Sequence, residues 1–194
     1  THYMVGSQET EPGAGWPYNT VLAALKERPT MSAPELARTI VDRYVASYRP
    51  TEDVTQSALY VDKVQELKAA LDALCGYIID KQREVELIVY RAAQWAQRFS
   101  DPDYKDLYDL CRLIVENAGE QTELARRAAE VMGLLAPPGA NRFVAAEAHR
   151  GFRMGRAHGV SIYFPYRAIS PFYRRLDFAS ESLWDDMLLR FVGV

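Results

Sequence analysis

Apolar residues recur every three or four positions through the middle of the chain, and this spacing predicts amphipathic helices. The charged segment 80–84, a turn at residues 100–103 and Gly119 separate each apolar stripe from the next. A Pro-Pro pair ends the last stripe, because proline cannot continue a helix. We therefore expect a helical subdomain over residues 62–136. The stripes are Val64, Leu67, Leu71, Leu74, Cys75 and Ile78; Val85, Ile88, Ala92, Trp95 and Phe99; Leu107, Leu110, Cys111 and Ile114; and Leu124, Ala128, Val131, Met132 and Leu135.

Two further helices are predicted nearer the start of the chain. Pro29 ends the first of them. Ser32 and Glu35 have the spacing of a capping box for the second, and Pro34 suits its first turn. Pro50 ends this second helix. The apolar stripes are Val21, Leu22 and Leu25 in the first helix, and Leu36, Ile40, Val41, Tyr44, Val45 and Tyr48 in the second.

Two short apolar segments at opposite ends of the chain predict strands. Residues 3–7 open with three apolar side chains, too few for a helix, and residues 160–164 form a continuous apolar run that suits burial on both faces. Residues 57–61 give a brief strand pattern, and the alanines within 143–149 make that segment ambiguous. The predicted fold class is α/β, with at least two strands, a largely helical middle and a C-terminal helix.

Two polar residues are predicted to cap helices at their N-termini. Asp62 precedes the first stripe of the helical middle, and Ser182 precedes the C-terminal helix. We expect that last helix to bury Leu183, Met187, Leu188 and Phe191.

The segment after the first strand is a polar loop punctuated by turn residues. Gly6 lets the backbone leave the sheet, while Pro12, Gly13 and Gly15 favour a turn. A strand that ends in a stiff polar loop is a common way to build a binding wall at a sheet edge. A purely structural turn is the alternative reading of the same composition.

Three segments carry a resemblance to the clostripain-like cysteine peptidases. Residues 3–18, Tyr-Met-Val-Gly-Ser-Gln-Glu-Thr-Glu-Pro-Gly-Ala-Gly-Trp-Pro-Tyr, resemble the strand and loop that follow the catalytic cysteine in that family. Residues 158–165, His-Gly-Val-Ser-Ile-Tyr-Phe-Pro, are similar to a later family strand. Leu-Asp-Phe-Ala at 176–179 and Trp-Asp-Asp at 184–186 are similar to its closing motifs. The three matches occur in the order of the family and cover most of the chain.

The resemblance implies a caspase-like α/β sheet and a cysteine endopeptidase that acts on peptide or protein substrates. The family places its nucleophilic cysteine after an aspartate, and its histidine base before a glycine, upstream of the first matched segment. Neither motif occurs here, so no catalytic residue is assigned. We expect residues 1–194, which start at Thr1 within a motif, to be the C-terminal part of one peptidase domain. The upstream catalytic segment of the same protein would then supply partners for the strands at 3–7 and 160–164.

The same resemblance implies that the opening loop lies beside the substrate pocket, with Ser7, Gln8, Glu9, Ala14 and Trp16 as the substrate-binding candidates. Family members that cut after arginine or lysine often carry an acid at the position of Ala14. Alanine offers a buried guanidinium no partner, which predicts a weaker preference for these residues. The family roles of the loop glutamates suggest that they cap nearby amides.

The composition and net charge of the chain exclude several classes of partner. The chain has 194 residues and a formal net charge of −3, and it contains no basic run, which disfavours nucleic acid and anionic membranes as partners. No apolar run approaches the ~20 residues of a membrane span. Cys75 and Cys111 lie among apolar neighbours and are expected to be buried free thiols. No cofactor is indicated, and the resemblance implies a secreted or cell-envelope location in a bacterium.

Two alternatives stay open at this point. The chain could be a non-catalytic helical scaffold or interaction module that kept the family architecture. Within it, the loop at 150–159 alternates Arg150, Arg153 and Arg156 with three glycines. Such a loop is typical of a solvated connection, and its functional alternative is a docking site for an acidic partner surface.

Overall fold

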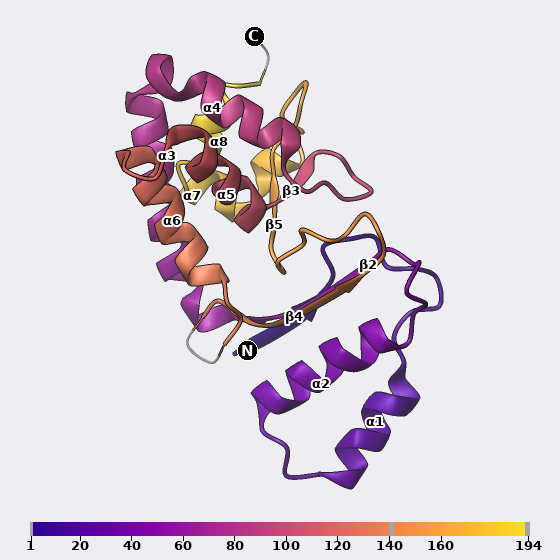
Figure 1. Cartoon of the computed structure of the whole chain (residues 1–194). Coiled ribbons are helices and arrows are strands. Elements are labelled where there is room, and N and C mark those ends of the chain that lie inside the picture. The colour runs from indigo at the N-terminus through magenta and orange to yellow at the C-terminus, as the bar shows by residue number, and fades with distance from the viewer. Residues whose placement is uncertain (1, 140–141, 193–194) are drawn as a thin grey trace.

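The computed structural model describes residues 2–139 and 142–192, so that Thr1 lies outside it, and it confirms the α/β class (Figure 1). The strands are β1 (Tyr3–Gly6), β2 (Val54–Tyr60), β3 (Tyr104–Asp106), β4 (Val144–Arg150) and β5 (Ser161–Tyr163). The α-helices are α1 (Tyr18–Glu27), α2 (Ala33–Ala46), α3 (Val64–Asp80), α4 (Gln82–Trp95), α5 (Leu107–Ala118), α6 (Glu123–Leu135), α7 (Asp177–Glu181) and α8 (Trp184–Leu188). Single 3₁₀ turns cover Val61–Lys63 and Tyr173–Arg175.

The larger sheet has the strand order β1-β2-β4, and both pairings are antiparallel. Tyr3 lies opposite Tyr60 in one pairing, and Val54 lies opposite Arg150 in the other. As the central strand, β2 is buried along almost its whole length. From the sequence, an upstream segment is expected to supply the partner strand of β1. On one edge of β1, that partner is instead β2 of this chain.

Helices cover both faces of this sheet. In Figure 1, α1 and α2 lie on one side of it and the larger helical group lies on the other. Ala37 and Val41 of α2 pack against Ala58 and Ala146 on β2 and β4. The predicted capping box at the start of α2 is confirmed, with both of its hydrogen bonds formed.

The helices α3 to α6 share one hydrophobic core with β5 and α8. Trp184 of α8 is buried in this core, and its indole Nε1 donates to the backbone oxygen of Tyr163, 2.7 Å away. Gly119 ends α5 with a φ of +83°, as the sequence predicts for a helix C-terminus. The helical subdomain over 62–136 stays a prediction.

The smaller sheet pairs β3 with β5, and the sequence pattern did not predict β3. Residues 104–106 read as polar, Tyr-Lys-Asp, yet Lys105 and Asp106 are fully buried. Burial, together with Arg98, lowers the pKa of Lys105 to about 8, although Asp103 and Asp101 oppose the shift. The lysine ammonium lies 4.3 Å from the ring centre of Tyr166 and donates to the backbone oxygen of Pro102.

Of the two side-chain caps predicted outside α2, the one at Asp62 is wrong. Asp62 lies in the 3₁₀ turn before α3, where it bonds to His2 Nδ1 at 2.6 Å instead of capping the helix. α8 begins after Leu183, and the Oγ of Ser182 accepts the amide of its first residue, Trp184, at 3.4 Å. The actual caps, Asp106 of α5 and Thr122 of α6, were not singled out from the sequence.

Some apolar residues predicted to be buried are exposed. Leu22, Val64 and Leu183 are exposed, and the side chain of Trp95 is 72% exposed at the end of α4. The helical stripe breaks there because α4 ends at Trp95, and Phe99 in the following loop packs with Met154 and Ala157 in a separate small cluster. Within the described residues, no helix is long and apolar enough to cross a membrane.

Candidate functional site

The loop after β1 is fixed to the neighbouring strand β2 by one buried threonine. The Oγ1 of Thr55 accepts the backbone amides of Gln8 and Glu9 at 2.9 and 3.0 Å. With both amides accepted there, its own hydroxyl proton points to Ser7 Oγ at 2.9 Å, and Ser7 Oγ donates to the backbone oxygen of Glu9 at 2.7 Å. The start of the predicted binding wall is thus held in one conformation.

The carboxylate of Glu9 is buried and occupied by backbone amides. Its oxygens accept the amide of Ser100 at 3.0 and 3.1 Å and the amide of Thr10 at 2.7 Å. These contacts join the opening loop to the segment after α4. Glu9 therefore has the amide-capping role that the sequence suggested for the loop glutamates.

The side chain of Gln8 bridges two segments far away in the sequence. Its Nε2 donates to Asp106 Oδ2 at 2.9 Å, and its Oε1 accepts the amide of Gly159 at 2.9 Å. Both ends of the amide are therefore used, which sets its orientation. Gly159 has a φ of +91°, and a Cβ there would lie 3.1 Å from Ser57 and Val144, so glycine suits this close approach.

Two buried aspartates at the start of α5 organise the surrounding loops. Asp106 accepts three donors: Gln8 Nε2, the amide of His158 at 2.6 Å, and the amide of Asp109 at 2.8 Å. Asp109 in turn accepts the amide of Gln97 at 2.7 Å and two nitrogens of Arg112. The apolar periodicity of the sequence does not point to this pair. The Asp-x-x-Asp spacing before an apolar stripe is the N-capping signal that could have found it.

His158 stacks on Tyr108, with ring centres 4.2 Å apart. Its Nδ1 lies 2.9 Å from the carbonyl oxygen of Arg156, which can only accept, so Nδ1 carries a proton. The same nitrogen lies 3.4 Å from Asp106 Oδ1. Burial alone would lower the pKa of His158, but the Asp106 carboxylate outweighs it and the pKa is raised.

We expect His158 to make stability depend on pH. The pKa of His158 in the folded protein lies above the unfolded value of ~6.5. Protonated His158 therefore contributes its full stabilisation of the folded state at pH values below ~6.5. The contribution disappears as the pH rises through the folded pKa. His158→Phe keeps a ring against Tyr108 and removes the charge. Urea unfolding of both proteins between pH 5.5 and 8 should show a difference that shrinks with rising pH, and a constant difference would contradict this assignment.

The candidates at the far end of the loop lie elsewhere. Trp16 Nε1 donates to Glu11 at 2.9 Å, and the indole packs edge-on against Tyr44 of α2, with ring centres 6.2 Å apart. Tyr48 holds the turn by donating to the backbone oxygen of Gly15 at 2.8 Å. Ala14 is exposed at the turn.

Two cavities adjoin Glu9. The first has a volume of about 270 Å³ and is lined by both Gln8 and Glu9. Ser7, Ala14 and Trp16 are not part of its lining. The structure therefore brings two of the five sequence candidates to one cavity. Its full lining is Gln8, Glu9, Thr10, Phe99, Asp101, Tyr104 and Ser161.

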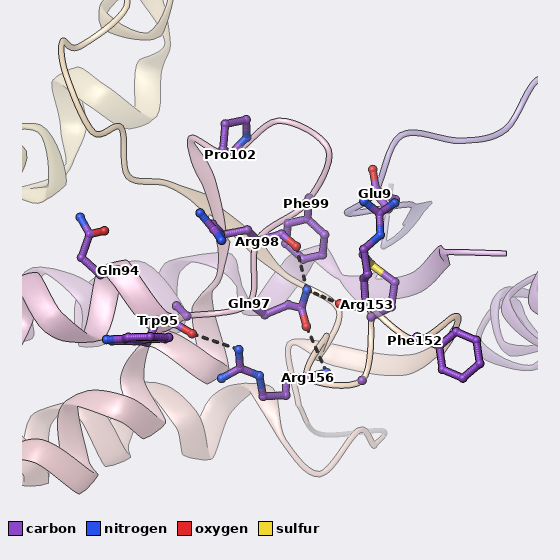
Figure 2. Close-up of a pocket in the computed structure, with 13 residues that line it drawn as sticks. Glu9, Gln94, Trp95, Gln97, Arg98, Phe99, Pro102, Phe152, Arg153 and Arg156 are labelled. Carbon is purple, nitrogen blue, oxygen red and sulfur yellow. Dashed lines mark hydrogen bonds between the residues drawn. The ribbon is translucent and has the colours of Figure 1, made fainter. Parts of the chain in front are cut away.

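The second cavity has a volume of about 570 Å³ and lies between the end of α4 and the loop after β4 (Figure 2). Glu9 lines it as well, beside Arg98, Arg153 and Arg156. The arginine-glycine loop noted in the sequence is thus one side of a cavity.

The described cysteines cannot supply a nucleophile. Cys75 and Cys111 are free, fully buried thiols, as the sequence predicted, and burial raises the pKa of both. A thiol with a raised pKa gives little thiolate at neutral pH. Within residues 2–139 and 142–192, no group of three or more His, Cys, Asp or Glu side chains is arranged to hold a metal ion.

The fold of this chain is similar to that of three solved structures of C11 or clostripain proteases. A secreted C11 cysteine protease from Bacteroides thetaiotaomicron, bound to an irreversible peptide inhibitor, superposes with a TM-score of 0.59 at 18% identity over 92% of this chain and 51% of that one. An inactive zymogen C11 protease from Parabacteroides distasonis gives a TM-score of 0.61 at 16% identity, over 93% and 51%.

A clostripain from Bacteroides thetaiotaomicron in complex with a peptide inhibitor gives a TM-score of 0.55 at 15% identity, covering 98% of this chain and 77% of that one. A sequence model of the clostripain family matches residues 1–190. The chain belongs to the clostripain family. It spans about half the length of the first two structures. A comparison with curated proteins found no match.

Proposed function

We propose that this chain is the C-terminal portion of a clostripain-type cysteine endopeptidase, in which it supplies part of the sheet and a wall of the substrate pocket. The observation that carries this proposal is the loop after β1. Gln8 and Glu9 face one cavity of about 270 Å³, and Thr55, Asp106 and Ser100 hold them in place. A preorganised wall beside a cavity is what a peptide-binding site requires.

The free edge of β1 supports a second part of the proposal. Among the described residues β1 pairs only with β2, so its other edge has unpaired backbone groups. Such an edge is a ready partner for a further strand. An upstream segment of the same protein that pairs there would place its nucleophile and base beside Gln8 and Glu9. The nucleophile and the histidine base are therefore assigned to that upstream segment.

The alternative is a non-catalytic interaction module with the same architecture. The two buried thiols favour it only if the upstream segment also lacks a cysteine and a histidine. The two functions differ in whether the full-length protein cleaves peptides.

We expect the full-length protein to hydrolyse fluorogenic peptides and to lose this activity when a thiol-alkylating reagent is added. Residues 1–194 alone should cleave nothing, because both thiols lie in the core.

Cys75→Ser and Cys111→Ser in the full-length protein should leave the alkylation-sensitive activity in place, although they lower stability. Loss of all turnover with a correctly folded Cys75→Ser variant would contradict the assignment.

A further inference from the structure

The cavity of about 570 Å³ between α4 and the loop after β4 has a rigid frame (Figure 2). Gln97 joins its two sides: Nε2 donates to the backbone oxygen of Arg153 at 2.7 Å, and Oε1 accepts the amide of Arg156 at 3.2 Å. Gln97 itself is buried. A frame held in this way needs little ordering when a ligand binds.

Around this cavity the arginine side chains are exposed to solvent, whereas the carboxylates that they contact are half-buried or buried. The side chains of Arg153 and Arg156 are 73% and 49% exposed, whereas the acids that they contact, Asp53 and Asp109, are 17% and 0% exposed. Arg98 is exposed, and its guanidinium has no hydrogen-bond or ion-pair partner in the described part of the chain. An approaching ligand therefore meets guanidinium groups first. Arginine is well suited to carboxylates because its fork can donate two parallel hydrogen bonds.

Two large aromatic side chains flank the same cavity from opposite sides in Figure 2. Trp95 is 72% exposed and Phe152 is 90% exposed. Tryptophan and arginine dominate the binding energy of many protein interfaces, so Trp95 beside these arginines is a suitable anchor for a ligand. The cavity can therefore hold both a carboxylate and an apolar side chain.

We propose that this cavity binds an acidic segment of a protein substrate, in which glutamate or aspartate alternates with apolar residues. The inference rests on the proposed function for the identity of the occupant. Glu9 lies between the docking cavity and the substrate pocket, because it lines this cavity and also the smaller one beside Gln8. A substrate that lies along the loop wall can thus extend its acidic part to the arginines.

The binding test uses the full-length protein and a dye-labelled peptide of alternating glutamate and leucine. Fluorescence anisotropy should show saturable binding that weakens with added salt, because the exposed charges are screened. The matched peptide with glutamine for glutamate should bind at least about tenfold more weakly, as expected for the loss of one charge-assisted contact. Equal affinity for the two peptides would overturn the proposal.

Charge and aromatic variants locate the binding surface. Arg98→Glu should weaken binding of the acidic peptide by about tenfold or more. Trp95→Ala should weaken binding of both peptides by about fivefold or more, because truncating an aromatic anchor removes apolar contact that both peptides share. The matched controls are Arg83→Glu and Tyr90→Ala, exposed residues of α4 that do not line the cavity. Unchanged affinity in both cavity variants, or an equal loss in the controls, would overturn the proposal.

Turnover separates this proposal from the proposed function. A peptide substrate with an acidic tail should have a higher kcat/KM than the same substrate with a neutral tail, and Arg98→Glu should remove the difference without slowing the neutral substrate. Binding without any turnover would reject the peptidase function and, with it, a substrate as the occupant. Turnover that ignores the tail would reject the docking site alone. A concentration-dependent dimer that Trp95→Ala abolishes, seen in sedimentation, would replace the substrate by a second copy and overturn the proposal.

Discussion

Replacing Asp106 with alanine is expected to lower the free energy of unfolding by on the order of 5 kcal/mol. The substitution leaves three donors without an acceptor: the buried amide of Asp109, and the half-buried Gln8 Nε2 and amide of His158. Each buried donor without a partner costs about 1–3 kcal/mol. Most domains have only about 5–15 kcal/mol of stability, so the variant should be close to unfolding. Urea denaturation with the m-value compared between proteins is the measurement.

Two control variants separate the hydrogen bonds of Asp106 from a general effect of substitution. Asp106→Asn keeps an oxygen for the amide of Asp109 but turns an NH₂ group toward Gln8 and His158. We therefore expect it to lower the free energy of unfolding by about half as much as Asp106→Ala. Asp42→Ala removes an exposed acid of α2 and should change stability by less than about 0.5 kcal/mol. A small effect of Asp106→Ala, similar to that of Asp42→Ala, would show that the three donors find other partners.

Replacing Glu9 with alanine is expected to lower the free energy of unfolding by about 3 kcal/mol, because the amides of Thr10 and Ser100 lose their shared acceptor. Glu9→Gln should cost only about 1 kcal/mol, since a single amide oxygen can accept both. Glu27 is exposed and has no partner in the described residues, so Glu27→Ala is the matched control for the loss of one negative charge. Denaturation of the three variants at neutral pH measures these differences.

The glutamine variant also decides between a structural and a substrate-binding role for Glu9. A structural role requires only the acceptor oxygen, so Glu9→Gln in the full-length protein should keep its rate on every peptide. A role in binding a positive charge requires the carboxylate. A selective loss of activity on arginine peptides with unchanged stability would therefore contradict the structural role.

Part of the candidate site could be predicted from the sequence. The strand and loop of residues 3–18 were singled out by their motif, and Gln8 and Glu9 do line a cavity. Spacing along the loop could not show that Trp16 turns toward α2 and packs on Tyr44 instead. The contacts of Glu9 with Ser100, and of Gln8 with Asp106 and Gly159, could not be predicted either, because they join residues 91 to 151 positions apart.

The sequence by itself determined the local elements: the helices, the capping box at Ser32, and the strands at either end. Their signals are periodicity and turn chemistry, which act over a few neighbouring residues. Only the tertiary structure decided that β2 lies between β1 and β4, and that the polar segment at 104–106 is a buried strand. Lys105 can be buried because it donates to the nearby backbone oxygen of Pro102 and faces the ring of Tyr166. Asp106 can be buried because Gln8 and His158, which are distant in the sequence, donate to it. Such long-range hydrogen bonds leave no periodic trace in the sequence.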